Sequence, residues 1–388
     1  MEMKKKRYDY IIVGAGSSGA VVASRLTEQS KNSVLVLEAG NKEHPYARMP
    51  MSFGLFIDKP GVNWRYRSER EHGTAGREIP IPRGKMLGGS SSINGLVYVR
   101  GQRLDYDTWA QMGNRKWSWE DVSKYFIKME NYEESNFTER GKNGPLGISE
   151  VPNKNPLYEA IIKSAEVLGY PRNNDYNGIS QEGISRVQAT MINGRRMSTD
   201  YAYLRHAKVR NNLDIITGAM TQNLILDKKK CTGVYYKKNG KQYKVFANKE
   251  IILCAGAINS PKILELSGIG NPKILKSYDL EVVHSLPAVG ENFQDHMMTR
   301  MQWKLRTSKV SYNHLGRGIN RLGEILKYIT LGKGLFSMPA ASVIAFLKTK
   351  SEILTPDIQI QFIPFSVENL KKRTFHKFPG MAVAGYQV

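Results

Sequence analysis

The sequence YDYIIVGAGSSGAVVASRLTEQSKNSVLVLEAG at residues 8–40 decides the fold of this chain. Three apolar residues at 11–13 are typical of a strand that is buried on both faces of a parallel sheet. Residues 14–19 (GAGSSG) then fit the pattern G-x-G-x-x-G where a helix begins. A second apolar run at 34–37 ends at Glu38. The stretch predicts a strand, a glycine turn, a helix and a second strand.

Each glycine of the turn has its own steric reason. Gly14 allows the tight turn, Gly16 lets the backbone approach a pyrophosphate, and Gly19 lets helix and strand pack closely. The free N–H groups and the positive end of the helix dipole attract phosphates. Glu38 stands nineteen residues after Gly19, where a carboxylate accepts hydrogen bonds from both ribose hydroxyls and repels a 2′-phosphate. The pattern predicts a dinucleotide site, whereas a bare glycine turn would be purely structural.

Length and composition limit the architecture. The chain has 388 residues, more than one hydrophobic core usually holds, so we expect two intertwined domains. It contains no run of eighteen apolar residues, which predicts no transmembrane helix. The basic opening and the apolar residues after it imitate a signal peptide, but they already belong to the nucleotide fold. Cys231 and Cys254 have no disulfide or metal-ligand spacing, so we predict no metal site and a reducing, cytoplasmic location.

The net charge of +22 raises the question of an anionic partner. Lysine and arginine are spread along the chain in short runs, and no nucleic-acid-binding motif accompanies them. We expect a solvated basic surface and no nucleic-acid partner. An anionic substrate and peripheral contact with a membrane remain open alternatives.

A second glycine-rich stretch, PRGKMLGGSSSINGLVYVRG, occupies residues 82–101. Its glycine pair followed by three serines predicts a tight turn and the start of a helix, which presents N–H groups to an anion or a heterocycle. A capped helix without a ligand is the alternative. Farther on, residues 251–253 predict another buried strand, and Ser260 is expected to cap a helix whose first residue is Pro261.

Together these stretches resemble the glucose-methanol-choline (GMC) family of FAD-dependent oxidoreductases. The resemblance continues through CAGAINSP at 254–261, SGIG at 267–270 and VGENFQDH at 289–296, and it covers essentially the whole chain. It implies an α/β fold, in which a Rossmann-type FAD-binding domain is combined with a discontinuous α+β substrate domain. The expected boundaries are residues 1–152 and 208–297 for the FAD-binding domain, and residues 153–207 and 298–388 for the substrate domain.

The resemblance also assigns binding residues. Gly14, Gly16, Ser18 and Gly19 are expected at the pyrophosphate, Glu38 at the ribose, Thr221 at the adenine, and Met86, Gly88, Gly89, Asn94, Gly95, Leu96 and Val97 along the flavin. Ala39 is also expected to bind the cofactor. Some relatives attach FAD covalently through a histidine before the matching asparagine. This chain has Ile93 there, so we expect FAD to be held noncovalently.

The implied reaction is oxidation of a CH–OH group to an aldehyde or ketone, with hydride passing to flavin N5, as in choline and alcohol dehydrogenases. The partners would be a small alcohol and an electron acceptor, whether oxygen, a quinone or a dye. Relatives carry their catalytic histidine in a C-terminal segment, and none of the seven histidines here matches that motif. We therefore assign no catalytic residue. The apolar residues 380–388 predict that the chain stops within an unpaired strand.

Three alternatives follow for the function. The chain is a fragment of a GMC-type enzyme, a catalytically inactive FAD-binding remnant, or a nonredox relative such as a lyase or a photodecarboxylase.

Overall fold

The computed structural model describes residues 7–132, 139–152, 154–369 and 373–388. The chain forms two compact units, each assembled from segments that are far apart in the sequence. Unit 1 comprises the described residues of 1–47, 55–94 and 198–294, and unit 2 comprises those of 48–54, 95–197 and 295–388.

These boundaries differ from the expected ones at four places. Residues 48–54 and 295–297 were expected in the FAD-binding domain and belong to unit 2. Residues 95–152 lie in unit 2, because the backbone after Leu96 is tied to unit 2 by hydrogen bonds such as that from Tyr98 N to Gln188 O. Residues 198–207 lie in unit 1, where Leu204 and Ala207 are buried in its core.

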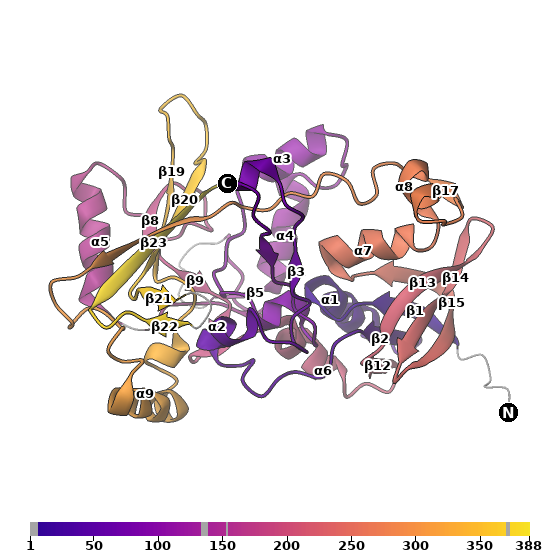
Figure 1. The fold of residues 1–388 in the computed structure, drawn as a ribbon, viewed down its shortest axis with the longest axis horizontal. Helices are drawn as coiled ribbons and strands as arrows, with labels where there is room; N and C mark the ends of the chain where they lie inside the picture. Colours follow the sequence, from indigo (N-terminus) through magenta and orange to yellow (C-terminus); the bar gives the residue numbers. More distant parts are fainter. Residues whose placement is uncertain (1–6, 133–138, 153, 370–372) are drawn as a thin grey trace. The chain divides into compact units, whose positions relative to one another are not determined.

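Unit 1 is built on a six-stranded sheet of order β12-β2-β1-β15-β14-β13 (Figure 1). Its strands are β1 (Arg7–Val13), β2 (Val34–Glu38), β12 (Leu213–Thr217), β13 (Met220–Asp227), β14 (Lys230–Lys238) and β15 (Lys241–Leu253). The first four strands in that order are parallel, and β14 and β13 continue the sheet antiparallel. The predicted strand, turn, helix and strand of residues 8–40 are confirmed.

The apolar run of β1 explains the layers of unit 1. Ile11 and Val13 point to one face, in a core cluster with Ile263 of α7 (Gly256–Glu265). Ile12 points to the other face, in a cluster with Ala20 of α1 (Ser17–Leu26). Because both faces are covered, the strand has no polar alternation.

The remaining elements of unit 1 are short. They are β3 (Tyr66–Arg67), η2 (His72–Thr74), β4 (Pro80–Ile81), η3 (Gly89–Ser92), η4 (Asp200–Leu204), α6 (Arg205–Ala207), β16 (Ile269–Gly270), α8 (Pro272–Ser277) and β17 (His284–Ser285). The segment 48–54 of unit 2 contains η1 (Pro50–Ser52), and α2 (Phe53–Phe56) begins in that segment and ends in unit 1.

Unit 2 contains an antiparallel sheet of order β18-β23-β20-β19-β8. Its strands are β8 (Gly183–Arg186), β18 (Thr299–Lys304), β19 (Val343–Leu347), β20 (Ile358–Ile363) and β23 (Gly380–Gln387). The helix α5 (Pro156–Val167) packs on this unit, and its Tyr158 and Ile162 are buried in the core.

The other elements of unit 2 surround this sheet. They are α3 (Arg103–Gln111), α4 (Trp119–Met129), β5 (Glu130–Asn131), β6 (Leu146–Gly147), β7 (Ser149–Glu150), β9 (Gln188–Ala189), β10 (Met191–Ile192), β11 (Arg195–Arg196), α9 (Gly318–Leu331), η5 (Leu335–Ser337), β21 (Val367–Asn369) and β22 (Thr374–Phe375).

One expectation for unit 2 needs correction. The strand at residues 380–388 is not left unpaired, because β23 pairs with β18 along one edge and with β20 along the other. In β20, Gln359 is buried and stands opposite Phe346 of β19.

Candidate functional site

A cavity of about 460 Å³ opens in unit 1 at the carboxyl ends of β1, β2 and β15. In the sheet, β1 has β2 as its neighbour on one side, reached through α1, and β15 as its neighbour on the other side, so the strand order reverses at β1. In open α/β sheets this switch in strand order is where ligands bind. All the residues that line the cavity belong to unit 1.

The glycine turn forms one wall of the cavity. A Cβ on Gly14, which has φ of +100°, would lie 2.4 Å from Cys254 O, and one on Gly19 would lie 1.9 Å from Gly14 O. Gly16 is different, because its nearest neighbour would be Gly89 Cα at 3.8 Å. Gly14 and Gly19 therefore serve the packing of the fold, whereas the space in front of Gly16 is left for a ligand.

The start of α1 supplies the polar groups of that wall. Gly16 is the N-cap and has no side chain to bond the first turn, and that turn contains no acidic residue. Ser17 and Ser18 line the cavity, and so do the basic side chains Arg83 and Lys262. Free N–H groups with positive charge nearby form a site suited to phosphate oxygens.

Glu38 lies at the end of β2 and is only 6% exposed. Its Oε2 accepts a hydrogen bond from Ala15 N and its Oε1 one from Gly40 N, both at 2.8 Å. Burial raises the pKa of this carboxyl above its usual value, against the two N–H groups and the charge of Lys85. Each carboxylate oxygen keeps a lone pair, so Glu38 can accept further hydrogen bonds from a ligand in the cavity.

Thr221, in β13, carries an unsatisfied polar atom. The residue is 8% exposed and lines the cavity, and its Oγ1 is buried without a hydrogen-bond partner among the described residues. A buried hydroxyl of this kind costs free energy unless something bonds it. A ligand with a polar edge at this end of the cavity would satisfy it.

An aromatic pair on the cavity wall was not predicted as part of the site. The Trp64 and Tyr66 rings stack 5.7 Å apart at 8°, and Lys85 Nζ lies 4.4 Å from the centre of the Trp64 ring. Tyr66 OH donates a 2.7 Å hydrogen bond to Asn259 Oδ1, which joins this wall to α7. The surrounding prolines and glycines indicated only a loop, although aromatic residues at alternate positions were the available signal.

The turn after β15 differs from the prediction. The helix α7 begins at Gly256 and not at Pro261, which lies inside it, and Ser260 Oγ accepts a hydrogen bond from Ala255 N at 3.1 Å. Gly256 has φ of +86°, and a Cβ there would meet no atom within 4 Å. Gly256 lines the cavity, and its positive φ is a backbone conformation that favours glycine at the start of this helix.

The glycine pair at 88–89 likewise forms less helix than expected. Only one 3-10 turn, η3, follows it. Gly88 N donates to Ala15 O at 2.9 Å, and a Cβ on Gly89 would lie 2.7 Å from Gly16 Cα. The pair thus joins this turn to the glycine turn at the cavity.

The predicted binding residues divide into four groups. Those that line the cavity are Gly14, Gly16, Ser18, Glu38, Ala39, Gly89 and Thr221. Gly19, Met86 and Gly88 support the wall from the interior, and Asn94 is exposed at the end of unit 1. Gly95, Leu96 and Val97 belong to unit 2, where they pair with Ala340, Thr190 and Ala189.

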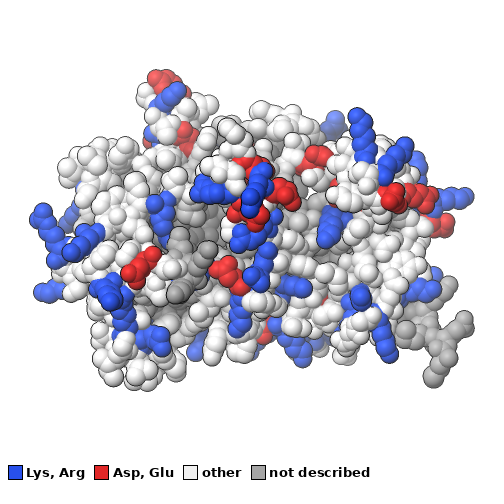
Figure 2. All heavy atoms as spheres, viewed as in Figure 1, with Lys and Arg blue, Asp and Glu red and all other residues white. Residues whose placement is uncertain are grey.

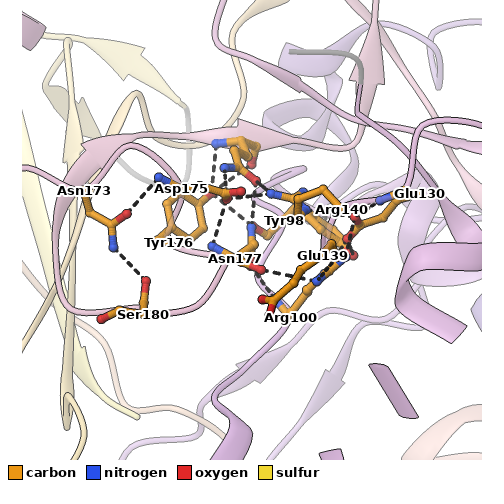
Figure 3. A network of polar contacts seen from close by, with 12 residues as sticks. Tyr98, Arg100, Glu130, Glu139, Arg140, Asn173, Asp175, Tyr176, Asn177 and Ser180 are labelled. Carbon is orange, nitrogen blue, oxygen red and sulfur yellow. Dashed lines mark hydrogen bonds and ion pairs between the residues drawn. The ribbon is translucent and has the colours of Figure 1, made fainter. Parts of the chain in front are cut away.

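A second polar cluster lies buried in unit 2 (Figure 3). Glu130 accepts hydrogen bonds from Arg100 Nη2 at 2.5 Å, Arg140 Nε at 2.9 Å and Tyr98 OH at 2.5 Å. Arg140 Nη1 also pairs with Asp175 at 2.6 Å. Although burial favours the neutral acid, the two arginines hold the pKa of Glu130 below its usual value. Two positive and two negative charges balance, so we interpret this cluster as structural.

Other types of site lack support in the described part of the chain. No helix there is long and apolar enough to cross a bilayer. No group of three or more His, Cys, Asp or Glu side chains is arranged there to hold a metal ion.

Comparison with known proteins agrees with this geometry. Two curated relatives are oxygen-dependent choline dehydrogenases, from Photobacterium profundum, 38% identical over 92% of this chain, and from Escherichia coli, 39% identical over 93%. The chain spans 63% and 66% of the lengths of these two relatives.

Solved structures of similar fold include pyridoxine 4-oxidase from Mesorbium loti, with a TM-score of 0.84, 26% identity and coverage of 98% of this chain and 71% of that one. An FAD-dependent oxidoreductase from Chaetomium thermophilum gives a TM-score of 0.82 and 28% identity, over 88% of this chain and 62% of that one. The predicted α/β architecture is therefore confirmed. The family model described as GMC oxidoreductase matches residues 8–298, and the chain belongs to the GMC oxidoreductase family.

Proposed function

We propose that unit 1 binds FAD noncovalently and that the chain is part of an oxidoreductase acting on the CH–OH group of a small alcohol. The observation that carries this proposal is the cavity in which the uncapped start of α1 and the buried Glu38 lie together. The first suits a pyrophosphate and the second a ribose, and a dinucleotide contains both.

The residues present fit the adenosine diphosphate half of FAD. The N–H groups near Gly16 and Ser18 would hold the pyrophosphate, with Arg83 and Lys262 offsetting its charge. Glu38 and Ala39 would hold the ribose, and Thr221 would meet the adenine and satisfy its unpaired hydroxyl. Within unit 1, Met86, Gly88, Gly89 and Asn94 remain our proposal for the flavin end. Ile93 is 7% exposed and carries no group that can bond covalently to a flavin.

When bound, FAD supplies the flavin N5 that accepts hydride. The contribution of these residues is to hold the cofactor and fix its orientation. No histidine of the described chain lines the cavity of unit 1, and we assign the acceptor of the alcohol proton to none of these residues.

We propose a small alcohol such as choline as the substrate, because both curated relatives named above are choline dehydrogenases. We propose that the electron acceptor is oxygen or a quinone, for which a dye can be substituted in an assay. We assign unit 2 to the substrate side and place the protein in the cytoplasm.

A titration tests the cofactor. The chain should quench FAD fluorescence at lower concentration than that of FMN, because FMN lacks the adenosine that Glu38 and Thr221 would contact. Replacing Glu38 with alanine should weaken FAD binding by about 1.5–3 kcal/mol, the usual contribution of a hydrogen bond to a charged group. The matched control is Glu28→Ala, since Glu28 forms only an exposed ion pair with Arg25. Equal affinity for FAD and FMN, or no effect of Glu38→Ala, would contradict the proposal.

A further inference from the structure

A hollow of about 410 Å³ in unit 2 is lined by lysines from three separate segments of the chain. These side chains are Lys154, Lys309, Lys327 and Lys333. The first precedes α5, the second lies in the loop between β18 and α9, and the last two lie within and just after α9. Figure 2 shows basic side chains beside α9, which lies at the lower left. Like charges that converge on one hollow repel one another, so a bound anion would stabilise them.

Glu324 is the acidic residue among the described residues that line this hollow. It is 7% exposed, its Oε2 accepts a hydrogen bond from Leu335 N at 2.5 Å, and its Oε1 lies 3.7 Å from Lys327 Nζ. A Cβ on Gly334 would lie 2.3 Å from Oε2, so the backbone packs directly against this carboxylate. Glu324 therefore holds the segment that carries Lys333 and compensates the charge of Lys327.

The other three lysines of the hollow have no such counter-charge. Lys154, Lys309 and Lys333 form no ion pair with any residue that the structure describes. Glu150 and Glu159, the acidic residues nearest to Lys154 in the sequence, are engaged in other ion pairs. Four lysines against one carboxylate leave three positive charges at the hollow.

Hydrogen bonds fix the segments that carry these lysines. Asn155 Nδ2 donates to Val310 O at 3.0 Å, and this bond joins the residues that follow Lys154 and Lys309. The bond from Leu335 N to Glu324 does the same for the segment after α9. Because the backbones are held together without a ligand, less conformational entropy is lost when a ligand binds.

We propose that this hollow binds a small molecule that carries a phosphate group. Lysine ammonium groups bind phosphate oxygens as point charges, and three of them match the charge of a phosphate or pyrophosphate better than that of a single carboxylate. Tyr312 lines the same hollow and can donate a hydrogen bond to the ligand. The lining residues belong to unit 2, and none of them lines the cavity proposed for FAD.

Lysine footprinting of the full chain locates the site. Inorganic pyrophosphate should slow the reaction of Lys154, Lys309 and Lys333 with an amine-reactive ester severalfold, as measured by mass spectrometry. Lys142 and Lys163 are exposed elsewhere in unit 2 and should react as before. Sodium chloride at the same ionic strength is the control for screening.

Calorimetry with pyrophosphate tests the charges, with FAD present so that its own site is filled. Lys309→Gln/Lys333→Gln should raise the Kd about tenfold, since two exposed charge pairs are lost. The matched control, Lys142→Gln/Lys163→Gln, should leave the Kd unchanged. All four lysines are exposed, so neither variant should prevent folding.

Vesicles that contain phosphatidylglycerol distinguish a soluble ligand from a lipid headgroup. Protection of the three lysines by these vesicles, but not by pyrophosphate, would overturn the proposal of a small soluble ligand. The proposal also fails if neither probe protects them, if sodium chloride protects them equally, or if Lys309→Gln/Lys333→Gln binds pyrophosphate like its control.

Discussion

Glu38 is a buried carboxylate that we propose accepts hydrogen bonds from the ribose. Burial raises its pKa above the ordinary 4.5, and ribose hydroxyls would donate to the ionised form and lower it again. FAD binding should therefore release a proton, and FAD affinity should fall as the pH drops through the raised pKa and level off above it. Titrations between pH 4.5 and 8 should show this slope, and Glu38→Gln should remove it. An unchanged slope in Glu38→Gln would place the titrating group elsewhere.

Glu130 has the opposite pKa shift, and its pH dependence concerns stability. Because Arg100 and Arg140 lower its pKa in the folded state, its contribution is complete above about pH 4.5 and is lost as the pH falls through that lowered value. Glu130→Gln leaves two buried arginines with less charge to balance them and should cost about 3–5 kcal/mol at pH 7. Urea unfolding should show this loss, and the exposed Glu352→Gln should show almost none. A loss below 1 kcal/mol would mean that the cluster is not structurally important.

In the turn from β1 to α1, one glycine is needed for folding and another for binding the cofactor. Gly19→Ala places a Cβ against Gly14 O and should destabilise unit 1, whereas Gly16→Ala meets nothing closer than 3.8 Å and should fold normally. The new methyl group of Gly16→Ala faces the cavity, however, and should weaken FAD binding about tenfold, or 1.4 kcal/mol. Thermal unfolding without FAD and an FAD titration distinguish the two effects. If Gly16→Ala binds FAD like the parent, the pyrophosphate does not lie at this turn.

Elements whose pattern is local could be predicted from the sequence. The buried run at Ile11, the glycine turn and Glu38 specify β1, α1 and β2, because each depends on neighbouring residues. The start of α7 was misjudged, since the serine and proline at 260–261 are typical of a helix N-terminus but Gly256 begins the helix at the cavity. The place of Trp64 and Tyr66 on the cavity wall was missed because it depends on the distant contact of Tyr66 with Asn259, although their mutual stacking is local.

For the molecule as a whole, we predict that this chain alone does not oxidise alcohols even with FAD bound. Positioned acid–base catalysis contributes about 10²–10⁴-fold, and we assign its base to no residue here. Mixed with choline or other alcohols, the yellow protein should neither bleach nor reduce a dye. Acid precipitation should leave its flavin in the supernatant, since Ile93 offers no covalent link. Alcohol-dependent bleaching would require a search for a base within the chain, and a yellow pellet would exclude noncovalent binding.

The division into units could not be predicted at residues 95–152. Their place in unit 2 depends on pairings such as Arg140 with Asp175, and on Asn177, whose side chain accepts a hydrogen bond from Arg100 N at 2.7 Å. These partners lie 35 and 77 residues apart, so no periodicity indicates them.

The interlacing of the two units has a consequence for how the protein is made. The chain passes between units at residues 47/48, 54/55, 94/95, 197/198 and 294/295, and β1 pairs with β15, which ends at Leu253. A ribosome that adds about 5–20 residues per second needs roughly ten seconds or more to reach that partner. During this time the apolar edge of β1 is open to wrong pairing. We therefore expect slow synthesis to lower the yield of folded protein, and chaperones that shield nascent strands to raise it.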